Sequence, residues 1–111
     1  MGLEVYWTEF SEKQLEKIFD YYQDKVSYSF ARKLTDGIYN EALKLEKQPE
    51  IGQIEELLQN RKQNFRYLVF MNYKIIYWIN NSEGRIEIND VFDTRQNPSK
   101  IKNKRMKPVP S

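Results

Sequence analysis

The residues from Phe65 to Arg95, FRYLVFMNYKIIYWINNSEGRIEINDVFDTR, decide how this chain folds. They contain three apolar runs separated by short polar breaks, and the runs span residues 65–71, 73–79 and 85–92. Runs rich in Ile, Val, Tyr, Phe and Trp, with turn residues between them, are typical of neighbouring β-strands. The stretch therefore predicts an antiparallel meander of three strands.

Two cations, Arg66 and Lys74, interrupt the first two predicted strands. An odd-length loop at Phe70-Met71-Asn72 would place them on the same face of the sheet, whereas a two-residue Met71-Asn72 loop would place them on opposite faces. Neither side of these strands is plainly polar, so we expect helices to cover one face and the other to be covered only in part. An apolar face that carries cations and stays partly bare is a candidate surface for a macromolecular partner.

Ahead of the meander, the sequence predicts one strand and two helices. Residues 3–7 alternate between apolar and polar, as a short strand does, and this strand is a natural neighbour or edge for the meander. Residues 11–26 and 27–48 then carry apolar side chains at three- and four-residue steps, the spacing of one helix face. The expected fold is α+β in the order β-α-α-β-β-β, with a helix hairpin packed on one face of a mainly antiparallel four-stranded sheet.

Local signals predict where the helices begin and end. Ser11 and Gln14 form a capping-box pattern for the first helix, and Ser27 or Ser29 can cap the second. Pro49 ends the second helix, because proline lacks the N–H that a helix interior needs. The residues that follow, 51–64, show no clear period and are expected to form a surface loop or a short helical turn.

Length and composition are those of one globular domain. The chain has 111 residues, of which 40% are hydrophobic and 31% are charged. We expect the domain to span residues 1–98 and a basic tail to follow at residues 99–111, where five cations stand without an acid. No apolar run approaches the roughly 18 residues of a membrane span, and the first residues lack the layout of a secretory signal. We therefore expect a cytoplasmic protein without membrane contact.

Cysteine and histidine are both absent from the chain. Their absence excludes disulfides, thiolate nucleophiles, Ser-His-Asp catalysis and metal sites built on Cys or His. We expect neither a cofactor nor a bound metal. Any catalytic site would have to use Lys, Arg, Tyr or carboxylates.

The charges are unevenly divided along the chain. Residues 1–60 hold 7 Lys/Arg and 12 Asp/Glu, a net charge of −5, whereas residues 61–111 hold 11 and 4, a net charge of +7. This division suggests that the sheet and the tail bind an acidic or polyanionic partner. A basic surface without a specific ligand is the alternative interpretation.

Five stretches of the chain stand in the order and at the spacing of a known toxin family. They are Trp7-Thr8-Glu9-Phe10-Ser11, Leu45-Glu46-Lys47-Gln48-Pro49-Glu50-Ile51-Gly52, Phe65-Arg66-Tyr67-Leu68-Val69, Tyr73-Lys74-Ile75-Ile76-Tyr77 and Val91-Phe92-Asp93-Thr94-Arg95-Gln96-Asn97-Pro98. Across residues 3–98 the chain resembles the RelE/ParE superfamily, the toxins of bacterial type II toxin–antitoxin pairs. Its Arg95-Gln96-Asn97-Pro98 ending is closer to the ParE-like branch.

The resemblance implies a small α+β toxin that a cognate antitoxin neutralises, and it leaves the target open because a fold does not settle a function. ParE-like members poison DNA gyrase and do no chemistry, and we place this function first. RelE-like members cleave messenger RNA on the ribosome, and an inactive member that only binds antitoxin is a further alternative. A homodimer and a toxin–antitoxin hetero-oligomer are both compatible with the family.

Under the RelE-like alternative, the resemblance assigns catalysis to Arg66, Lys74 and Arg95, which would stabilise charge on the phosphate. The chain departs from that pattern at Leu68, where such enzymes tend to carry a second Lys, and it has no Tyr near the closing Arg. Under either alternative, the side chains expected to contact the target are Arg66, Lys74, Tyr77, Arg95, Asn97, Lys100 and Lys102.

The same residues have a purely structural interpretation. The cations of the first two strands can pair with a carboxylate across the sheet, such as Asp90 or Glu87. Arg95 can pair with Asp93. The aromatic residues of the second strand are candidates for the core.

Overall fold

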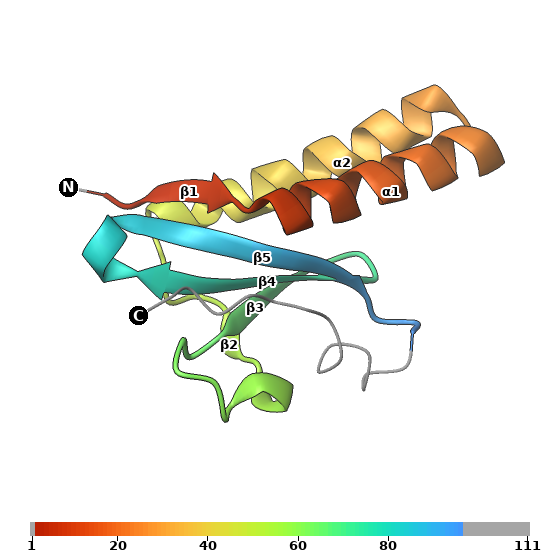
Figure 1. Cartoon of the computed structure of the whole chain (residues 1–111). Coiled ribbons are helices and arrows are strands. Elements are labelled where there is room, and N and C mark those ends of the chain that lie inside the picture. The colour runs from red at the N-terminus through yellow and green to blue at the C-terminus, as the bar shows by residue number, and fades with distance from the viewer. Residues whose placement is uncertain (1, 97–111) are drawn as a thin grey trace.

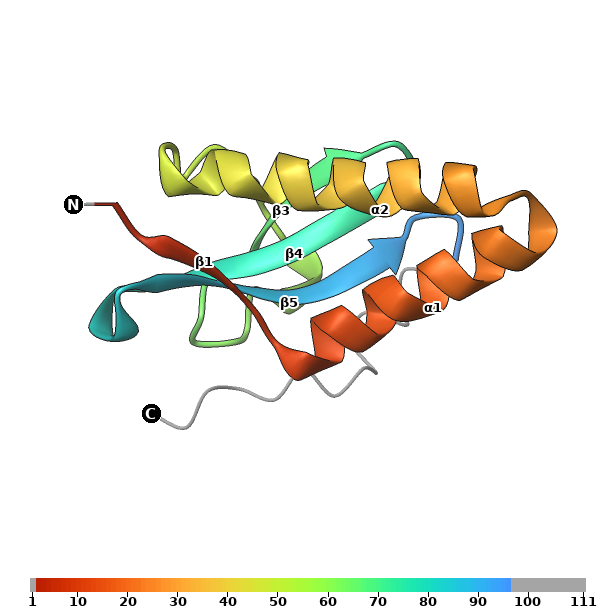
Figure 2. The same cartoon turned by 90° about the horizontal axis from the view of Figure 1, so that it is seen from above.

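A computed structural model describes residues 2–96 and shows two helices packed on one face of a five-stranded sheet (Figures 1 and 2). The helices and strands are β1 (Glu4–Trp7), α1 (Glu9–Lys25), α2 (Tyr28–Leu43), β2 (Gln53–Ile54), β3 (Arg66–Phe70), β4 (Tyr73–Asn80) and β5 (Arg85–Asp93). The sheet order is β1-β5-β4-β3-β2, and only the β1–β5 pairing is parallel. The expected α+β class and helix hairpin are confirmed, and the sheet has one strand more than expected.

The predicted meander forms β3, β4 and β5. The turn between β3 and β4 is the two-residue Met71-Asn72 loop, with Phe70 opposite Tyr73 and Met71 at a positive φ of 54°. A hairpin turn this short needs a left-handed residue because only then does its twist match that of the strands. The loop length fixes the register of β3 on β4 and therefore which side chains share a face.

The beginning of α1 differs from the prediction. Thr8, and not Ser11, caps this helix: Thr8 Oγ1 accepts a hydrogen bond from the Ser11 N–H at 3.2 Å. Thr8 keeps the extended backbone of β1, with φ −66° and ψ 158°, so the helix begins as soon as the strand ends. Ser11 is buried and donates its hydroxyl to the carbonyl of Thr8 at 2.8 Å.

The second helix begins at one of its two predicted caps and ends early. Ser27 caps α2 by accepting a hydrogen bond from the Phe30 N–H at 3.0 Å. The helix ends at Leu43, because the next turn tightens into a 3-10 helix at Lys44–Glu46 before the chain reaches Pro49. The α1–α2 turn projects beyond the end of the sheet (Figures 1 and 2).

The larger hydrophobic core lies between the helices and the sheet. Its buried residues come from both helices, from the turn after α2 and from β3, β4 and β5, and they include Leu15, Leu34, Ile38, Leu45, Tyr73, Ile75, Tyr77, Ile86, Ile88 and Val91. Gly37 lets α2 approach β3, because a Cβ at this position would stand 2.3 Å from the ring of Phe70. The glycine therefore serves helix–sheet packing.

A second, smaller core covers part of the opposite sheet face. Leu58 and Phe65, from the chain between β2 and β3, pack on Ile76 of β4 and Phe92 of β5. The stretch 51–64, expected to be a loop or a helical turn, contains the edge strand β2 and the 3-10 helix Glu56–Leu58. A strand of two residues has no readable alternation, so the sequence pattern could not reveal it.

Among the residues that the structure describes, no helix is long and apolar enough to cross a membrane.

Candidate functional site

Arg66 and Lys74 lie on opposite faces of the sheet. The two-residue turn pairs Arg66 with Tyr77 and Val69 with Lys74, so Arg66 shares the helix side of the sheet with Tyr77 while Lys74 points to the other side. Arg66 also lies four strand positions from Phe70 at the turn, roughly 13 Å at about 3.3 Å per residue. The register therefore rules out a shared cationic face formed by these two residues.

Arg66 holds the chain that leads into β2. Its Nη1 donates to the carbonyl oxygens of Gly52 at 2.9 Å and Glu50 at 3.2 Å. An arginine fork is suited to this task because it offers several donors in fixed directions. The side chain thus ties β3 to the residues just before the edge strand.

Lys74 is paired with an acid that the sequence pattern did not single out. Its ammonium lies 2.9 Å from Glu55 Oε1 and 4.2 Å from the ring centroid of Tyr67. The side chain of Glu55 is only 3% exposed and that of Lys74 is 21% exposed. Glu55 therefore takes the place of the expected cross-sheet partners, and Glu87 pairs with Arg85 at 2.8 Å.

Tyr77 is completely buried, so its side chain offers no surface to a target. Its hydroxyl donates to the carbonyl of Pro49 at 2.7 Å and accepts from the Gly52 N–H at 3.0 Å. Burial raises the pKa of this phenol above its ordinary value. Tyr77 is a core residue, as the structural interpretation of these aromatics expected.

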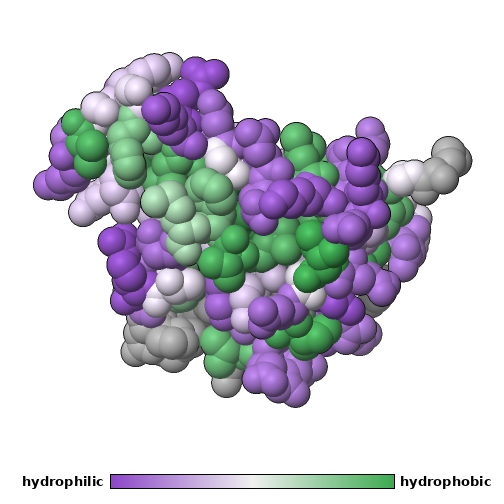
Figure 3. Space-filling view, turned by 180° about the vertical axis from the view of Figure 1, so that it is seen from behind, coloured by the Kyte–Doolittle hydropathy of each residue, from purple (hydrophilic) through white to green (hydrophobic). Residues whose placement is uncertain are grey.

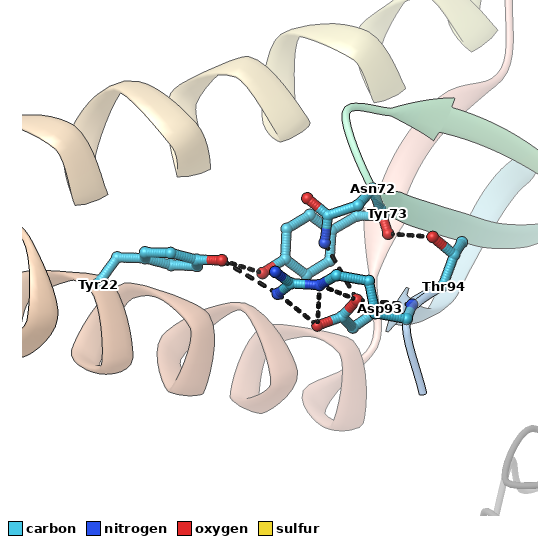
Figure 4. A network of polar contacts seen from close by, with 6 residues as sticks. Tyr22, Asn72, Tyr73, Asp93 and Thr94 are labelled. Carbon is cyan, nitrogen blue, oxygen red and sulfur yellow. Dashed lines mark hydrogen bonds and ion pairs between the residues drawn. The ribbon is translucent and has the colours of Figure 1, made fainter. Parts of the chain in front are cut away.

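Arg95 lies beyond the end of β5 and joins a network of polar contacts with α1 and with the β3–β4 turn. Figure 4 shows this network through its labelled members, among them Tyr22 of α1, Asn72 of the turn and Asp93. Its guanidinium binds Asp93 through Nη2–Oδ2 at 2.8 Å and Nε–Oδ1 at 3.0 Å. The same Nη2 donates to the hydroxyl of Tyr22 at 3.2 Å. The ion pair anticipated between Arg95 and Asp93 is present, and the network adds a tyrosine from α1.

The backbone around Arg95 is fixed by the β3–β4 turn. Asn72 Nδ2 donates to Asp93 Oδ1 at 3.0 Å, and both the N–H and the hydroxyl of Thr94 donate to the carbonyl of Asn72 at 2.8 Å. Asp93 is thus held from two sides, and it holds the guanidinium in turn. The hydrogen bonds from Arg95 lower the pKa of Asp93 to about 2.

Beside this network lies a pocket of about 520 Å³, which we call the Arg95 pocket. It is lined by residues of α1, β4, β5 and the residues after β5, namely Gln14, Lys17, Ile18, Tyr21, Tyr22, Tyr73, Val91, Asp93, Arg95 and Gln96. The volume falls in the range of about 300–1,000 Å³ typical of ligand sites. Burial, together with a hydrogen bond to Tyr22, raises the pKa of the Tyr73 phenol, which is neutral at physiological pH.

Sequence analysis identified Arg95 but missed the residues of α1 that complete the pocket. Lys17 and Tyr21 are exposed positions of an amphipathic helix, and such positions carry no pattern that marks a site. Only the tertiary packing of α1 along the end of β5 brings them to Arg95. Three further residues expected at the target surface, Asn97, Lys100 and Lys102, lie outside the described residues.

The three cations proposed for RNA cleavage do not form one cluster. Lys74 is on the sheet face away from the helices, Arg66 is bound to backbone carbonyls, and Arg95 lies at the turn end of the sheet beside Asp93. Within residues 2–96, no group of three or more Asp and Glu side chains is placed to hold a metal ion. Within residues 2–96, Arg66, Lys74 and Arg95 therefore do not assemble one cationic site of the kind that phosphoryl chemistry needs.

Two comparisons place the chain among known toxins. The profile of a family described as the ParE toxin of the type II toxin–antitoxin system, parDE, matches residues 5–98. A comparison with curated proteins finds no match. Among solved structures, the chain resembles one described as the chromosomal ParDE toxin–antitoxin system from P. aeruginosa, with a TM-score of 0.68 and 16% sequence identity over 82% of this chain and 95% of that chain.

At 16% identity, the likeness to the solved structure supports the fold alone. The family profile, which matches residues 5–98, shows membership of the family. The chain belongs to the family of ParE toxins of type II toxin–antitoxin systems.

Proposed function

We propose that this protein inhibits growth by binding DNA gyrase, does no chemistry of its own, and is neutralised by a cognate antitoxin. The observation that carries the proposal is the dispersal of Arg66, Lys74 and Arg95 over separate parts of the sheet. A ribonuclease without histidine needs several cations around one phosphate, because their field must act on the charge that develops there. A binding protein has no such requirement. Gyrase as the target follows from the resemblance to ParE-like toxins.

The surface offered to the target includes Arg95 and the basic residues that follow it in the sequence. The side chain of Arg95 is 61% exposed although it is paired with Asp93. Lys100 and Lys102 stand a few residues further along the chain. Cations at the rim of an interface speed association and favour an acidic partner.

The surface offered to the antitoxin includes the open edge of β3. In the described chain, β2 pairs with β3 only at Arg66 and Tyr67, so the rest of the β3 edge has no neighbouring strand. Seen from this side, hydrophobic residues gather across the middle of the molecule (Figure 3). The exposed apolar side chains of β2, β3 and the β3–β4 turn are Ile54, Val69 and Met71, and Leu43 is exposed at the end of α2. An extended antitoxin segment can add a strand here and cover them.

A side-by-side assay with purified gyrase and with translating ribosomes tests the choice of target. The proposal expects trapped gyrase–DNA breaks or lost supercoiling, and intact messenger RNA. Ribosome-dependent cleavage that disappears in Arg66→Ala, Lys74→Ala or Arg95→Ala would instead establish the RelE-like alternative. A chain that is harmless on expression would contradict toxicity itself.

Co-purification tests the partner. The tagged chain is expressed together with the product of the neighbouring reading frame, and we expect the two to elute as one complex. Expression of both chains should restore growth. A pull-down that recovers the toxin alone, with growth still inhibited, would contradict neutralisation.

A further inference from the structure

The Arg95 pocket has one wall of mainly apolar and aromatic side chains and another of charged side chains. One wall is formed by Ile18, Tyr21 and Tyr22 of α1. Another is formed by Asp93, the last residue of β5, and by Arg95, which follows it. Tyr21 is 55% exposed, while Tyr73 at the base of the pocket is 3% exposed. Tyrosine and arginine are the residue types that dominate the binding energy of protein interfaces, since each joins a large contact area to a polar end.

Arg95 is fixed in place but keeps donors for a ligand. Its Nε and Nη2 are used by Asp93 and Tyr22. Among the described residues, Nη1 has no hydrogen-bond partner. An incoming carboxylate can therefore bind a guanidinium whose orientation is already set, so that little further entropy is lost.

The charge inside the pocket favours a carboxylate. Its charged lining residues are Lys17, Asp93 and Arg95. Asp93 is compensated by Arg95 and by the amide of Asn72. Lys17 thus leaves the pocket with one positive charge in excess, which attracts a peptide carrying one or two acids.

The surroundings disfavour a long polyanion at this place. Helix α1 carries five acids and three bases in its seventeen residues, EFSEKQLEKIFDYYQDK. A nucleic-acid backbone carries a charge at every nucleotide and would meet this net negative charge along the helix. A peptide can place its one or two acids at Lys17 and Arg95 and present apolar side chains elsewhere. Toward the end of the hairpin, Tyr21 of the pocket and Val26 are exposed, and both suit the apolar side of an amphipathic segment.

We propose that the Arg95 pocket anchors an acidic, amphipathic segment of the antitoxin. A carboxylate of the segment binds Arg95 Nη1 and the Lys17 ammonium, and a neighbouring apolar side chain packs on Ile18 and Tyr21. The inference rests on the proposed neutralisation by an antitoxin and gives it a second anchor, beside α1 and the end of β5, in addition to the β3 edge. An occupied pocket also covers Arg95, which the target surface includes.

The test measures the affinity of the full-length chain for the purified product of the neighbouring reading frame. Arg95→Met should raise Kd by at least about tenfold, and Lys17→Glu and Tyr21→Ala by several fold, within the range of interface hot spots and their neighbours. These losses should shrink in high salt for the two charge variants, since screening weakens the same attraction in the wild type. A merely structural role for Arg95 would not produce that salt dependence.

Arg32 supplies a matched control. It pairs with Asp36 at 3.2 Å and donates to the hydroxyl of Tyr28 at 3.2 Å, on the open surface of α2. Arg32→Met therefore removes the same kind of arginine–aspartate–tyrosine group outside the lining of the Arg95 pocket, and Kd should change less than about twofold. Thermal unfolding of each variant checks its fold, and the exposed Lys17→Glu keeps the test valid if Arg95→Met is unstable.

The possible outcomes distinguish a failure of the pocket proposal from a failure of the proposed neutralisation by an antitoxin. If the wild type binds the antitoxin and the pocket variants bind equally well, the anchor is wrong while neutralisation stands. If the wild type does not bind, both are overturned. If fluorescein-labelled oligo(dT) binds in a manner that depends on Arg95 and Lys17, and the antitoxin does not, the pocket serves nucleic acid and the proposal is overturned.

Discussion

Tyr77 shows how one buried hydroxyl can hold a chain segment that has little regular structure. Its ring lies in the core, and its hydroxyl reaches the backbone of Pro49 and Gly52, between the end of the helix hairpin and the edge strand β2. Water cannot replace this partner, because Tyr77 and Gly52 are both buried. The segment after α2 thus depends on a residue 25 to 28 positions later in the chain.

Replacing Tyr77 by Phe should lower the free energy of unfolding by about 1–3 kcal/mol, because it leaves the buried Gly52 N–H without a partner and removes the hydrogen bond to the carbonyl of Pro49. Urea denaturation followed by circular dichroism measures the change. Tyr67→Phe is the matched control: the Tyr67 hydroxyl donates to Gln53 in an exposed position at 3.0 Å, so its loss should cost less than about 0.5 kcal/mol. Equal effects of the two substitutions would contradict the role given to Tyr77.

Asp93 should make the protein sensitive to acid. Its pKa of about 2 in the folded chain lies below the ordinary value of 3.8, so its contribution to stability is present above pH 4 and is lost as the pH falls toward 2. In Asp93→Asn this part of the pH dependence should be absent, and the fall in stability between about pH 4 and pH 2 should be shallower. Denaturation curves at a series of pH values measure it, and parallel curves for the two proteins would contradict it.

At the scale of elements, the Lys74–Glu55 pair and the small core around Phe65 help to hold the edge strand β2 and the 3-10 helix after it to the sheet. Glu55 also caps this 3-10 helix by accepting from the Leu57 N–H at 3.2 Å. A buried carboxylate has lost its interaction with water, so it depends on the positive charge of its partner for stabilisation.

Lys74→Met should therefore destabilise the fold by about 3–5 kcal/mol, because it leaves Glu55 charged and buried without its partner. The double variant Lys74→Met/Glu55→Gln should recover at least half of this loss, since the glutamine oxygen can still cap Leu57. A double-mutant cycle with thermal unfolding measures both. Additive effects in the cycle would show that the pair is not coupled.

Two glycines mark close approaches between elements, and they should respond differently to a methyl group. At Gly52 a Cβ would stand 2.5 Å from Tyr77 Oη and 2.8 Å from the backbone oxygen of Tyr67. At Gly37 the three nearest atoms would all belong to the ring of Phe70, a partly buried side chain that can move. Gly52→Ala should cost about 1–3 kcal/mol and Gly37→Ala less, because overpacking is worst where backbone must shift. Chemical denaturation measures both, and the reverse order would contradict the packing described.

Elements with a strong period could be predicted from the sequence, and those without one could not. The strands rich in Ile, Val and Tyr and the two amphipathic helices were readable because burial imposes their spacing. The α1 cap was misplaced because Thr8 and Ser11 are both good capping residues, and only the end of β1 at Trp7 decides between them. The sequence left the length of the β3–β4 turn open, because Asn72 suits both a Phe70-Met71-Asn72 loop and a two-residue Met71-Asn72 loop. The faces on which Arg66 and Lys74 lie were therefore open as well.

Of the candidate site, Arg95 and its pairing with Asp93 could be anticipated because the two residues are neighbours in sequence. The contribution of α1 to the Arg95 pocket could not, since Lys17 and Tyr21 are ordinary surface residues until tertiary packing brings them beside β5. Glu55 was missed for a related reason: a single acid in a segment without a period gives no sign that it will be buried.

For the whole molecule, the division of charge along the sequence should govern association with the target. The basic residues 61–111 carry a net charge of +7, and Arg95 and the cations after it lie in this half. Binding to gyrase should weaken as salt rises, and Lys100→Glu/Lys102→Glu should slow association by about tenfold with little effect on dissociation. Surface plasmon resonance at low and high salt measures both rates, and a change confined to dissociation would contradict a steering role.

The parallel pairing of β1 with β5 joins the strand that comes first along the chain to the strand that comes last among the described residues. During translation, which adds about 5–20 residues per second, β1 leaves the ribosome before β5, its strand partner within residues 2–96, has been made. The sheet can close only when the codons for β5 have been read and that strand has emerged. The Arg95 pocket, which needs both α1 and the end of β5, can therefore assemble in a nascent chain only after that strand has been made.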